Sequence, residues 1–286
     1  MGERFELHRY LKHGHKFVEG WMLPAAAKMI TTLSAVQDAK RISGNVAEIG
    51  VHHGKLFILL YLLSQGDERA VAIDLFGDQM RNIDHSDAGN LGKFRANLLR
   101  YAHADLRRVV VHTGDSRELH GSALKRLAGG PYRLISIDGG HTAENTAHDL
   151  AIAVEALAPG GVIILDDYFN EMWPGVCEGV HRYFREPRGI LPFATGANKT
   201  FFCASGAIAL YVDSLRSIAT KTLEHDFLGA RILCCDFDPL PFTERVGKDS
   251  RWRAVKDTGP LRIARQAYHF ARAMRSAIHW HLVNRI

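Results

Sequence analysis

The sequence predicts an α/β fold built on a doubly wound, mostly parallel sheet, with helical additions at both ends. Three observations predict it. From residue 44 onward, short apolar strands alternate with helical segments, a pattern typical of parallel strands joined by helices. The strands end repeatedly in an acidic residue. Two later apolar runs, KTFFCAS (199–205) and AIALYV (207–212), are spaced like a hairpin that would complete the sheet.

Each element has its own signal. Five runs rich in Val and Ile are expected strands, because such residues favour the pleated backbone; they span 45–50, 70–76, 107–115, 132–138 and 160–168. Four amphipathic or apolar runs between them are expected helices, and they span 54–65, 93–102, 116–128 and 143–158. Gly66 ends the first of these helices, as glycine often does.

We expect three regions along the chain. Residues 1–43 form a helical extension, with one helix over 24–42, and residues 44–212 form the main domain. Residues 213–286 form a C-terminal extension, in which ARILCCDFD (230–238) is an edge strand and 261–286 is a basic amphipathic helix. These extensions are candidate interfaces of a homo-oligomer.

Composition narrows the class of protein. The 286 residues are 47% hydrophobic and 23% charged, with a net charge of +5, which is ordinary for a globular protein and too small to indicate nucleic-acid binding. No apolar run of about 18 residues is present, so no membrane span is expected. The four cysteines form no CxxC pair, and the N-terminus lacks an apolar core. We therefore expect a cytoplasmic protein.

A glycine turn follows the first strand. In VAEIGVHHG, Glu48 ends the strand and Gly50 and Gly54 follow it, so that a ligand could come close to the turn and to the helix N-terminus behind it. The second strand ends in Asp74, whose carboxylate could accept both hydroxyls of a ribose. The third ends in Asp115 and Ser116, which could address an adenine edge.

This order of motifs resembles the class I S-adenosylmethionine-dependent methyltransferases. The resemblance covers roughly residues 44–212. It implies a seven-stranded sheet whose last strand is antiparallel, and S-adenosylmethionine as cofactor. Glu48, Gly50, Gly54, Asp74, Asp115, Ser116 and Asp138 would then form the cofactor site.

The fourth and fifth strands end in further carboxylates. Asp138 opens IDGGH, and Asp166 and Asp167 close VIILDDY. Carboxylates from neighbouring strand ends would repel one another unless a proton or a cation lay between them. Since hard cations prefer oxygen ligands, we expect Asp138, Asp166 and Asp167 to bind Mg²⁺ or Mn²⁺.

The spacing is similar to that of the metal-dependent O-methyltransferases of the catechol and macrolide-sugar type. That resemblance implies that His141, three residues after Asp138, is the base that takes the acceptor's proton, and that the acceptor is a hydroxyl of a small molecule such as a sugar. The segments IDGGH, LAPGGVIILDDY and WPGV (173–176) carry it.

Other interpretations stay open. The carboxylates could be helix caps, and His141 could only position a substrate or hold a loop. Among functions, the alternatives are a metal-independent methyltransferase, an NAD-dependent dehydrogenase and a non-catalytic binding module. The dehydrogenase is disfavoured because G-x-G-x-x-G is missing, and the module because binding alone would not need the acids and His141.

Overall fold

The computed structural model describes residues 2–83 and 88–237. The strands are β1 (Asn45–Ile49), β2 (Ala70–Asp74), β3 (Val109–Thr113), β4 (Tyr132–Ile137), β5 (Leu157–Asp166), β6 (Ile190–Gly196), β7 (Lys199–Ala204), β8 (Lys221–Phe227) and β9 (Ala230–Asp236). The α-helices are α1 (Gly2–Lys12), α2 (Pro24–Ala39), α3 (Lys55–Leu63), α4 (Leu91–Ala102), α5 (Gly121–Ala128), α6 (Ala143–Ala156), α7 (Pro174–Tyr183) and α8 (Ile208–Ile218).

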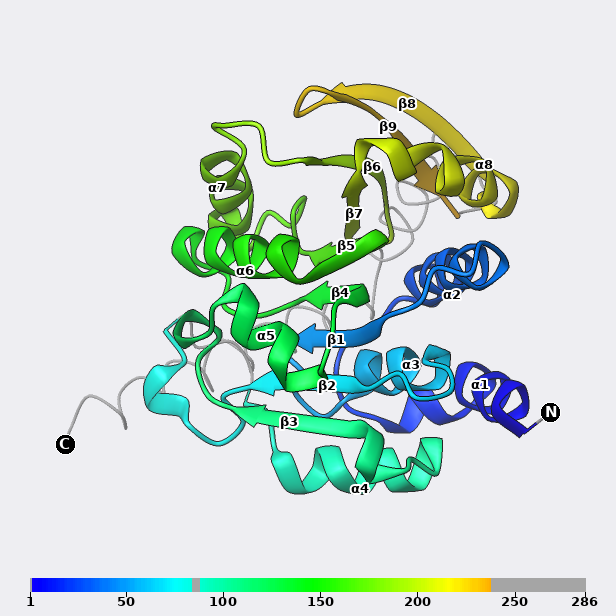
Figure 1. Cartoon of the computed structure of the whole chain (residues 1–286), viewed down its shortest axis with the longest axis vertical. Helices are drawn as coiled ribbons and strands as arrows, with labels where there is room; N and C mark the ends of the chain where they lie inside the picture. The colour runs from blue at the N-terminus through cyan, green and yellow to red at the C-terminus, as the bar shows by residue number, and fades with distance from the viewer. Residues whose placement is uncertain (1, 84–87, 238–286) are drawn as a thin grey trace, which may run out of the picture. The chain divides into compact units, whose positions relative to one another are not determined.

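All of these strands form one mixed sheet in the order β3-β2-β1-β4-β5-β7-β6-β9-β8 (Figure 1). The pairs from β3 through β5 are parallel, and β7 runs antiparallel between β5 and β6. The predicted α/β, mostly parallel fold is therefore confirmed. The expected count of seven strands was too low for the described residues, because β9 pairs with β6 and β8 with β9.

The predicted hairpin had the wrong partner. β7 does follow KTFFCAS, but it pairs with β6, which precedes it, across a turn at Ala197 and Asn198. AIALYV is instead the start of α8, where Tyr211 and Leu215 are buried one helical turn apart. The run is apolar but short, and periodicity alone cannot separate a helix from a strand over so few residues.

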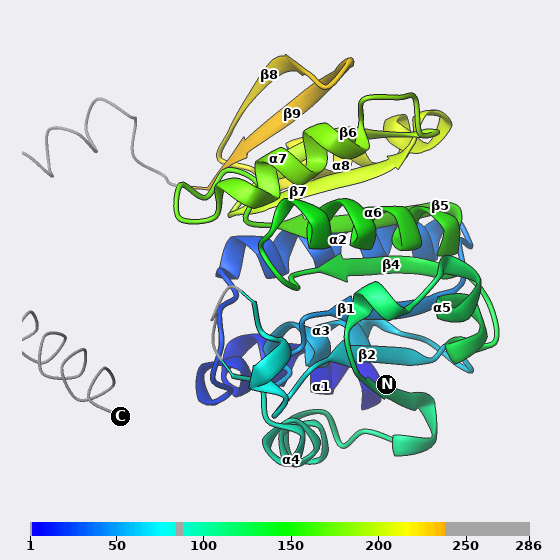
Figure 2. The same cartoon turned by 90° about the vertical axis from the view of Figure 1, so that its left-hand side faces the viewer.

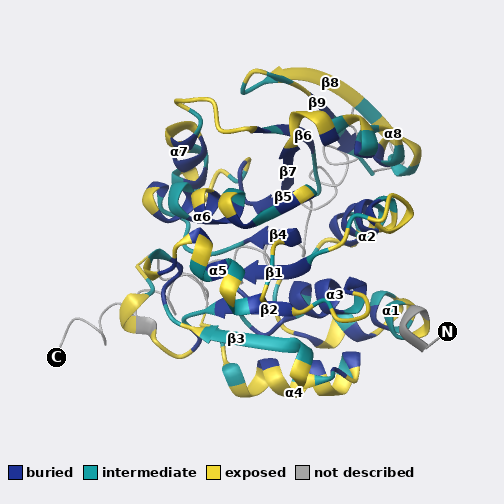
Figure 3. Cartoon of the chain, viewed as in Figure 1, coloured by how far each residue is buried: buried dark blue, intermediate teal, exposed yellow. Residues whose placement is uncertain are grey.

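Helices cover both faces of the sheet (Figure 2). Alternate residues of each strand point to opposite faces, so Val46 belongs to the core shared with α2, α3 and α8, while Ala47 belongs to the core shared with α5, α6 and α7. The central parallel strands β1, β2 and β4 are buried along nearly their whole length, whereas β3 at the edge of the sheet is half-buried (Figure 3). This burial explains why their sequences read as continuous apolar runs.

The two ends of the chain add to this sheet. Helix α2, near the predicted 24–42, packs beside α8 and α3. ARILCCDFD does form a strand, β9, but the edge of the sheet is β8, so the expected edge strand lies one position inside. The predicted basic helix at 261–286 lies outside the described residues. Within them, no helix is long and apolar enough to cross a membrane.

Candidate active site

The site lies where the order of the sheet reverses. β2 and β3 follow β1 on one side, and β4 lies on the other, so the carboxyl ends of β1 and β4 form the crevice in which open α/β sheets bind ligands. The two backbones nearly touch there: a Cβ on Gly50, which has φ +83°, would lie 1.8 Å from the carbonyl oxygen of Asp138. Only glycine fits this approach.

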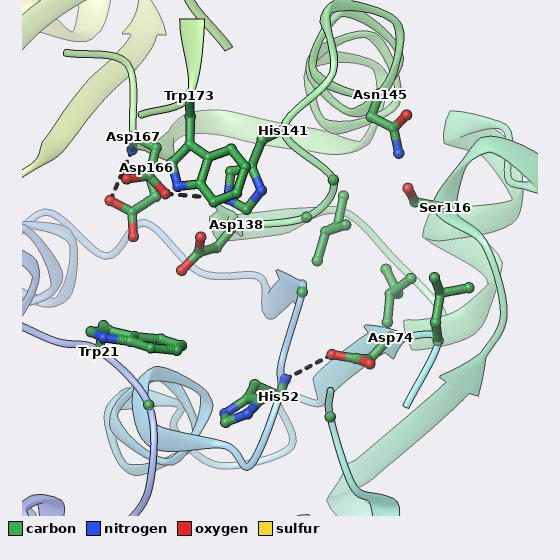
Figure 4. A pocket seen from close by; sticks show the side chains of 18 of the residues that line it. Trp21, His52, Asp74, Ser116, Asp138, His141, Asn145, Asp166, Asp167 and Trp173 are labelled. Carbon is green, nitrogen blue, oxygen red and sulfur yellow. Dashed lines mark hydrogen bonds and ion pairs between the residues drawn. The ribbon is translucent and has the colours of Figure 1, made fainter. Parts of the chain in front are cut away.

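A cavity of about 760 Å³ opens above this crevice, a size typical of small-molecule sites. Figure 4 shows Asp74, Ser116 and Asn145 toward one end, and Asp138, Asp167 and His141 toward the other. The predicted site residues that line it are Gly50, Asp74, Asp115, Ser116, Asp138, His141, Asp166 and Asp167. The structure thus brings most of the predicted site together in one space.

Glu48 and Gly54 do not line the cavity. Alternation along β1 turns Glu48 to the same face as Val46, where it is buried, and burial together with Asp138 raises the pKa of its carboxyl well above the usual range. Gly54 has φ +88° at the start of α3, and a Cβ there would meet the ring of Phe94. Both residues thus lie next to the glycine turn but outside the lining of the cavity.

Asp74 organises the glycine turn. Its Oδ2 accepts hydrogen bonds from the backbone N–H groups of Val51 at 2.6 Å and His52 at 2.7 Å (Figure 4). The other oxygen, Oδ1, accepts one from the N–H of Phe76. Since a carboxylate oxygen can accept two hydrogen bonds, Oδ1 retains capacity for a ligand hydroxyl.

Asp115 is also engaged, because its carboxylate accepts hydrogen bonds from the Arg117 guanidinium. Those bonds hold the pKa of Asp115 below its usual value. Ser116 lies beside it, on the rim of the cavity.

Three side chains form a candidate metal group. One ligand atom from each of Asp138, His141 and Asp167 lies within 4.8 Å of the others. Two carboxylates are suitable ligands for Mg²⁺ or Mn²⁺, whereas an imidazole nitrogen is a less favoured ligand for Mg²⁺. The donor set therefore fits a cation held by Asp138 and Asp167, with His141 beside it.

Asp167 is held rigidly. Its backbone adopts φ +61°, uncommon outside glycine, and its Oδ1 accepts hydrogen bonds from Asn170 at 2.6 Å and Asn198 at 2.8 Å. Its Oδ2 lies 3.4 Å from Nε2 of His141. Burial alone would raise the pKa of this carboxyl, but the hydrogen bonds from His141, Asn170 and Asn198 outweigh burial and lower it to about 2. Asp167 is therefore an anion at neutral pH.

Asp166 differs from its neighbour. Its Oδ2 is paired with the ammonium group of Lys199, and its Oδ1 accepts a hydrogen bond from Asn198 at 2.9 Å. Burial and the nearby Asp138 raise the pKa of Asp166 well above its usual value. In this structure the three predicted metal ligands therefore do not form one group. Asp138 and Asp167 lie together with His141, whereas Asp166 is paired with Lys199.

Two tryptophans border the same end of the cavity. The ring of Trp173 stacks on that of His141, with centroids 4.0 Å apart and planes 15° apart. Trp21 lies across the cavity from the carboxylates (Figure 4) and is 73% exposed. The stacked face keeps the imidazole in one orientation, and the exposed indole offers a flat apolar surface to a ligand.

The sequence did not predict roles for Trp21, Asn198 or Lys199. Asn198 occupies a two-residue turn in which Ala197 and Asn198 both have positive φ, and Asn in such a turn is a recognisable hairpin signal. That signal was available in the ATGANKT segment, but the hairpin was expected further along. Trp21 carried no signal, because its place depends on how the N-terminal segment folds over the sheet.

Comparison with known proteins agrees with this geometry. Residues 47–168 match the family model of a methyltransferase domain. The structure of the O-methyltransferase NovP superposes with a TM-score of 0.54 and 17% identity, covering 63% of this chain and 80% of that chain. A putative O-methyltransferase from Klebsiella pneumoniae shows 21% identity, 70% and 89% coverage and a TM-score of 0.47. An O-methyltransferase from Bacillus cereus, solved with S-adenosylhomocysteine (SAH), shows 19% identity over 69% of this chain and 89% of that chain, with a TM-score of 0.47. No curated protein matches in sequence.

The fold and the family match define a class I methyltransferase domain, with the glycine turn, Asp74 and Asp138 inside the matched residues. Residues 47–168 are accordingly identified as a methyltransferase domain. The family match decides against the dehydrogenase and the non-catalytic module.

A buried acid behind the cofactor end gives a pH-dependent prediction. Asp149 on α6 is fully buried, and the interaction that the Ser116 hydroxyl offers its carboxylate does not offset that burial. Burial raises its pKa to about 7 from 3.8. Between these values the folded state binds a proton that the unfolded state has lost, so stability falls as pH rises, by about 1.4 kcal/mol per pH unit.

We therefore expect Asp149→Asn to leave stability unchanged near pH 4 and to raise it progressively up to about pH 7, above which the gain stays constant. Denaturant unfolding of both proteins at pH 4.5 and pH 8 measures the difference. Asp213→Asn, on the exposed face of α8, is the matched control. A gain of the same size at both pH values would show that Asp149 is not protonated in the folded state.

Proposed function

We propose that the protein is an O-methyltransferase that transfers the methyl group of S-adenosylmethionine to a hydroxyl of a small molecule, with a divalent cation at the acceptor end. One observation carries the proposal. A single cavity joins the glycine turn and Asp74, suited to the donor, to the group of Asp138, His141 and Asp167, suited to the acceptor. Both substrates can therefore meet without leaving the crevice.

The donor end is formed by three strand ends. Gly50 leaves room for the ligand beside the backbone, and the free capacity of Asp74 Oδ1 suits a ribose hydroxyl. Ser116 lies on the rim at the third strand, where it could address the adenine edge. S-adenosylmethionine brings an activated methyl group on a sulfonium, so positioning supplies much of the rate.

At the acceptor end, Asp138 and Asp167 would hold the cation. When bound, Mg²⁺ or Mn²⁺ would favour loss of the hydroxyl proton by its positive charge. His141 would accept that proton as the oxygen's electron pair attacks the methyl carbon. The carbon–sulfur bond breaks with its electrons going to sulfur, which leaves neutral SAH. Asp167, an anion 3.4 Å from His141, stabilises the imidazolium that results.

The acceptor class follows from the shape of this end. Trp21 and Trp173 border it, and aromatic faces pack well against the apolar face of a ring. We propose a ring that carries a hydroxyl, with a sugar or glycosylated metabolite as the first class to test. The cytoplasm remains our proposal for where the protein works, because Cys177, Cys203, Cys234 and Cys235 are all free thiols.

A metal-independent methyltransferase is the second candidate, and one observation favours it. Lys199 already places a positive charge against Asp166, with its ammonium 3.8 Å from Asp138. In that enzyme the carboxylates would orient the acceptor directly, and His141 would remain the base.

Calorimetric titration tests these proposals. S-adenosylmethionine and SAH should each bind the chelator-treated protein, and Mg²⁺ or Mn²⁺ should give a separate binding signal. Asp167→Asn should remove the metal signal while SAH binding persists. Donor binding without a metal signal would favour the metal-independent enzyme, and absence of donor binding would contradict the proposed function.

A further inference from the structure

Lys199 is the first residue of β7 and is only 3% exposed. The antiparallel register pairs it directly with Asp166 of β5, and directly opposed residues project from the same face of a sheet. The register of two strands therefore fixes an ammonium group at the acceptor end of the cavity.

Alternation brings other carboxylates to the same face. Ile164 and Phe201 lie in the same core cluster as Val46 and Leu134. Side chains an even number of positions apart on a strand point the same way. Glu48 and Asp166 lie two positions after Val46 and Ile164, Lys199 lies two positions before Phe201, and Asp138 directly follows β4, four positions after Leu134, so all four are placed on this face. Two of these acids, Asp138 and Asp166, form ion pairs with Lys199 of the antiparallel strand β7.

The ion pairs show how the lysine is shared. Its Nζ is paired with Oδ2 of Asp166 and lies 3.8 Å from Oδ2 of Asp138. Asp138 is also a member of the candidate metal group with His141 and Asp167. A divalent cation on Asp138 would therefore come close to the lysine's charge, and two cations in a partly buried site repel strongly.

We propose that Lys199 is an internal cation that occupies Asp166 and competes with the divalent ion for Asp138, so that this lysine sets how tightly the metal binds. The inference rests on the proposed function, because it concerns the same acceptor end. In this arrangement Asp166 binds the lysine ammonium, and the ammonium and the divalent ion compete for Asp138.

Binding of Mn²⁺ alone, followed by the EPR signal of the free ion, tests the inference without any turnover. Lys199→Met removes the charge and keeps the length of the side chain, so it should tighten Mn²⁺ binding by at least about tenfold. Lys221→Met, on the exposed strand β8, makes the same change of net charge far along the sheet and should leave binding unchanged.

Two further variants separate the lysine from its partner. Asp166→Asn should weaken Mn²⁺ binding, because the released ammonium then turns fully to Asp138. The double variant Lys199→Met with Asp166→Asn should bind Mn²⁺ at least as well as the wild type, because it removes both members of the pair. Titration with SAH, together with circular dichroism, shows whether each variant is folded.

The outcomes are distinct. The inference is supported if Lys199→Met binds Mn²⁺ more tightly than the wild type and the double variant retains binding. It is also supported if the wild type shows no Mn²⁺ binding and Lys199→Met does. Unchanged or absent binding in a folded Lys199→Met variant overturns it, and so does loss of Mn²⁺ by the double variant, which would make Asp166 a metal ligand. Should Lys199→Met fail to fold, stronger or unchanged binding by Asp166→Asn would overturn it. Failure of SAH to bind any variant would contradict the proposed function and leave the metal result to be judged separately.

Discussion

His141→Ala should lower kcat by about 10²- to 10⁴-fold while leaving SAH binding unchanged. The loss is expected to be large because the imidazole would take the proton that must leave as the new bond forms. The ring is also held in place by Trp173 on one face and by Asp167 at its nitrogen, so no solvent water is equally well oriented. The measurement is single-turnover methyl transfer, with saturating donor, once an acceptor has been found.

His120→Ala is a matched control for that variant. His120 precedes α5, is exposed and does not line the cavity, so its removal should leave kcat unchanged. His141→Gln should behave like His141→Ala, since an amide does not accept the proton at neutral pH. Full turnover by His141→Ala would leave the histidine no role as base. A rise in KM with unchanged kcat would indicate that it only positions the acceptor.

The acidic strand ends were predictable from sequence because they depend on local order. A parallel sheet brings the carboxyl ends of its strands to one edge, so Asp74, Asp115 and Asp138 were expected together once the strands were recognised. The structure confirms that they line one cavity. The roles of these residues in binding stay predictions.

What the sequence did not predict depends on which segments pair across the sheet. Lys199 opposes Asp166 only because β7 inserts between β5 and β6, and that pairing cannot be read from the run KTFFCAS alone. The direction of the Glu48 side chain was predictable in principle. Side chains alternate along a strand, so Glu48 points to the same buried face as Val46 and away from the cavity. Proximity to the glycine turn in sequence suggested contact with the ligand, but the strand geometry places Glu48 behind the cavity.

The most unexpected buried residue is Arg133 in β4, because an arginine inside an apolar strand is not a residue that the sequence pattern places in the core. Its side chain is fully buried. Its Nε donates to Glu68 at 3.0 Å, and Nη1 donates to Ser34 at 3.0 Å and to Gln37 at 2.8 Å. Its Nη2 donates to the carbonyl of Leu63 at 2.7 Å. The guanidinium thus joins α2, the end of α3 and the loop before β2 to the sheet.

Arg133→Met should lower the free energy of unfolding by about 3–5 kcal/mol, because removing one member of a buried pair leaves its partners without donors. Among the residues that the structure describes, the Glu68 carboxylate would then keep as donors the backbone N–H groups of Gly44 and Gln65. Denaturant unfolding, monitored by circular dichroism, measures the loss. Arg126→Met on the exposed surface of α5 is the matched control and should change stability by less than about 0.5 kcal/mol.

A double-mutant cycle tests whether the ion pair itself causes the loss. Glu68→Gln alone should also destabilise, since it weakens the acceptor of a buried guanidinium. The double variant should lose less than the sum of the two single losses, because the second substitution removes a group that the first has already left without its charged partner. Additive losses would assign the stability to packing of the arginine stem and to its bonds with Ser34, Gln37 and Leu63. Arg133 lies near the start of β4, whereas Lys199 pairs with Asp166 at the carboxyl end of β5, so Arg133→Met should alter Mn²⁺ affinity only if the fold is lost.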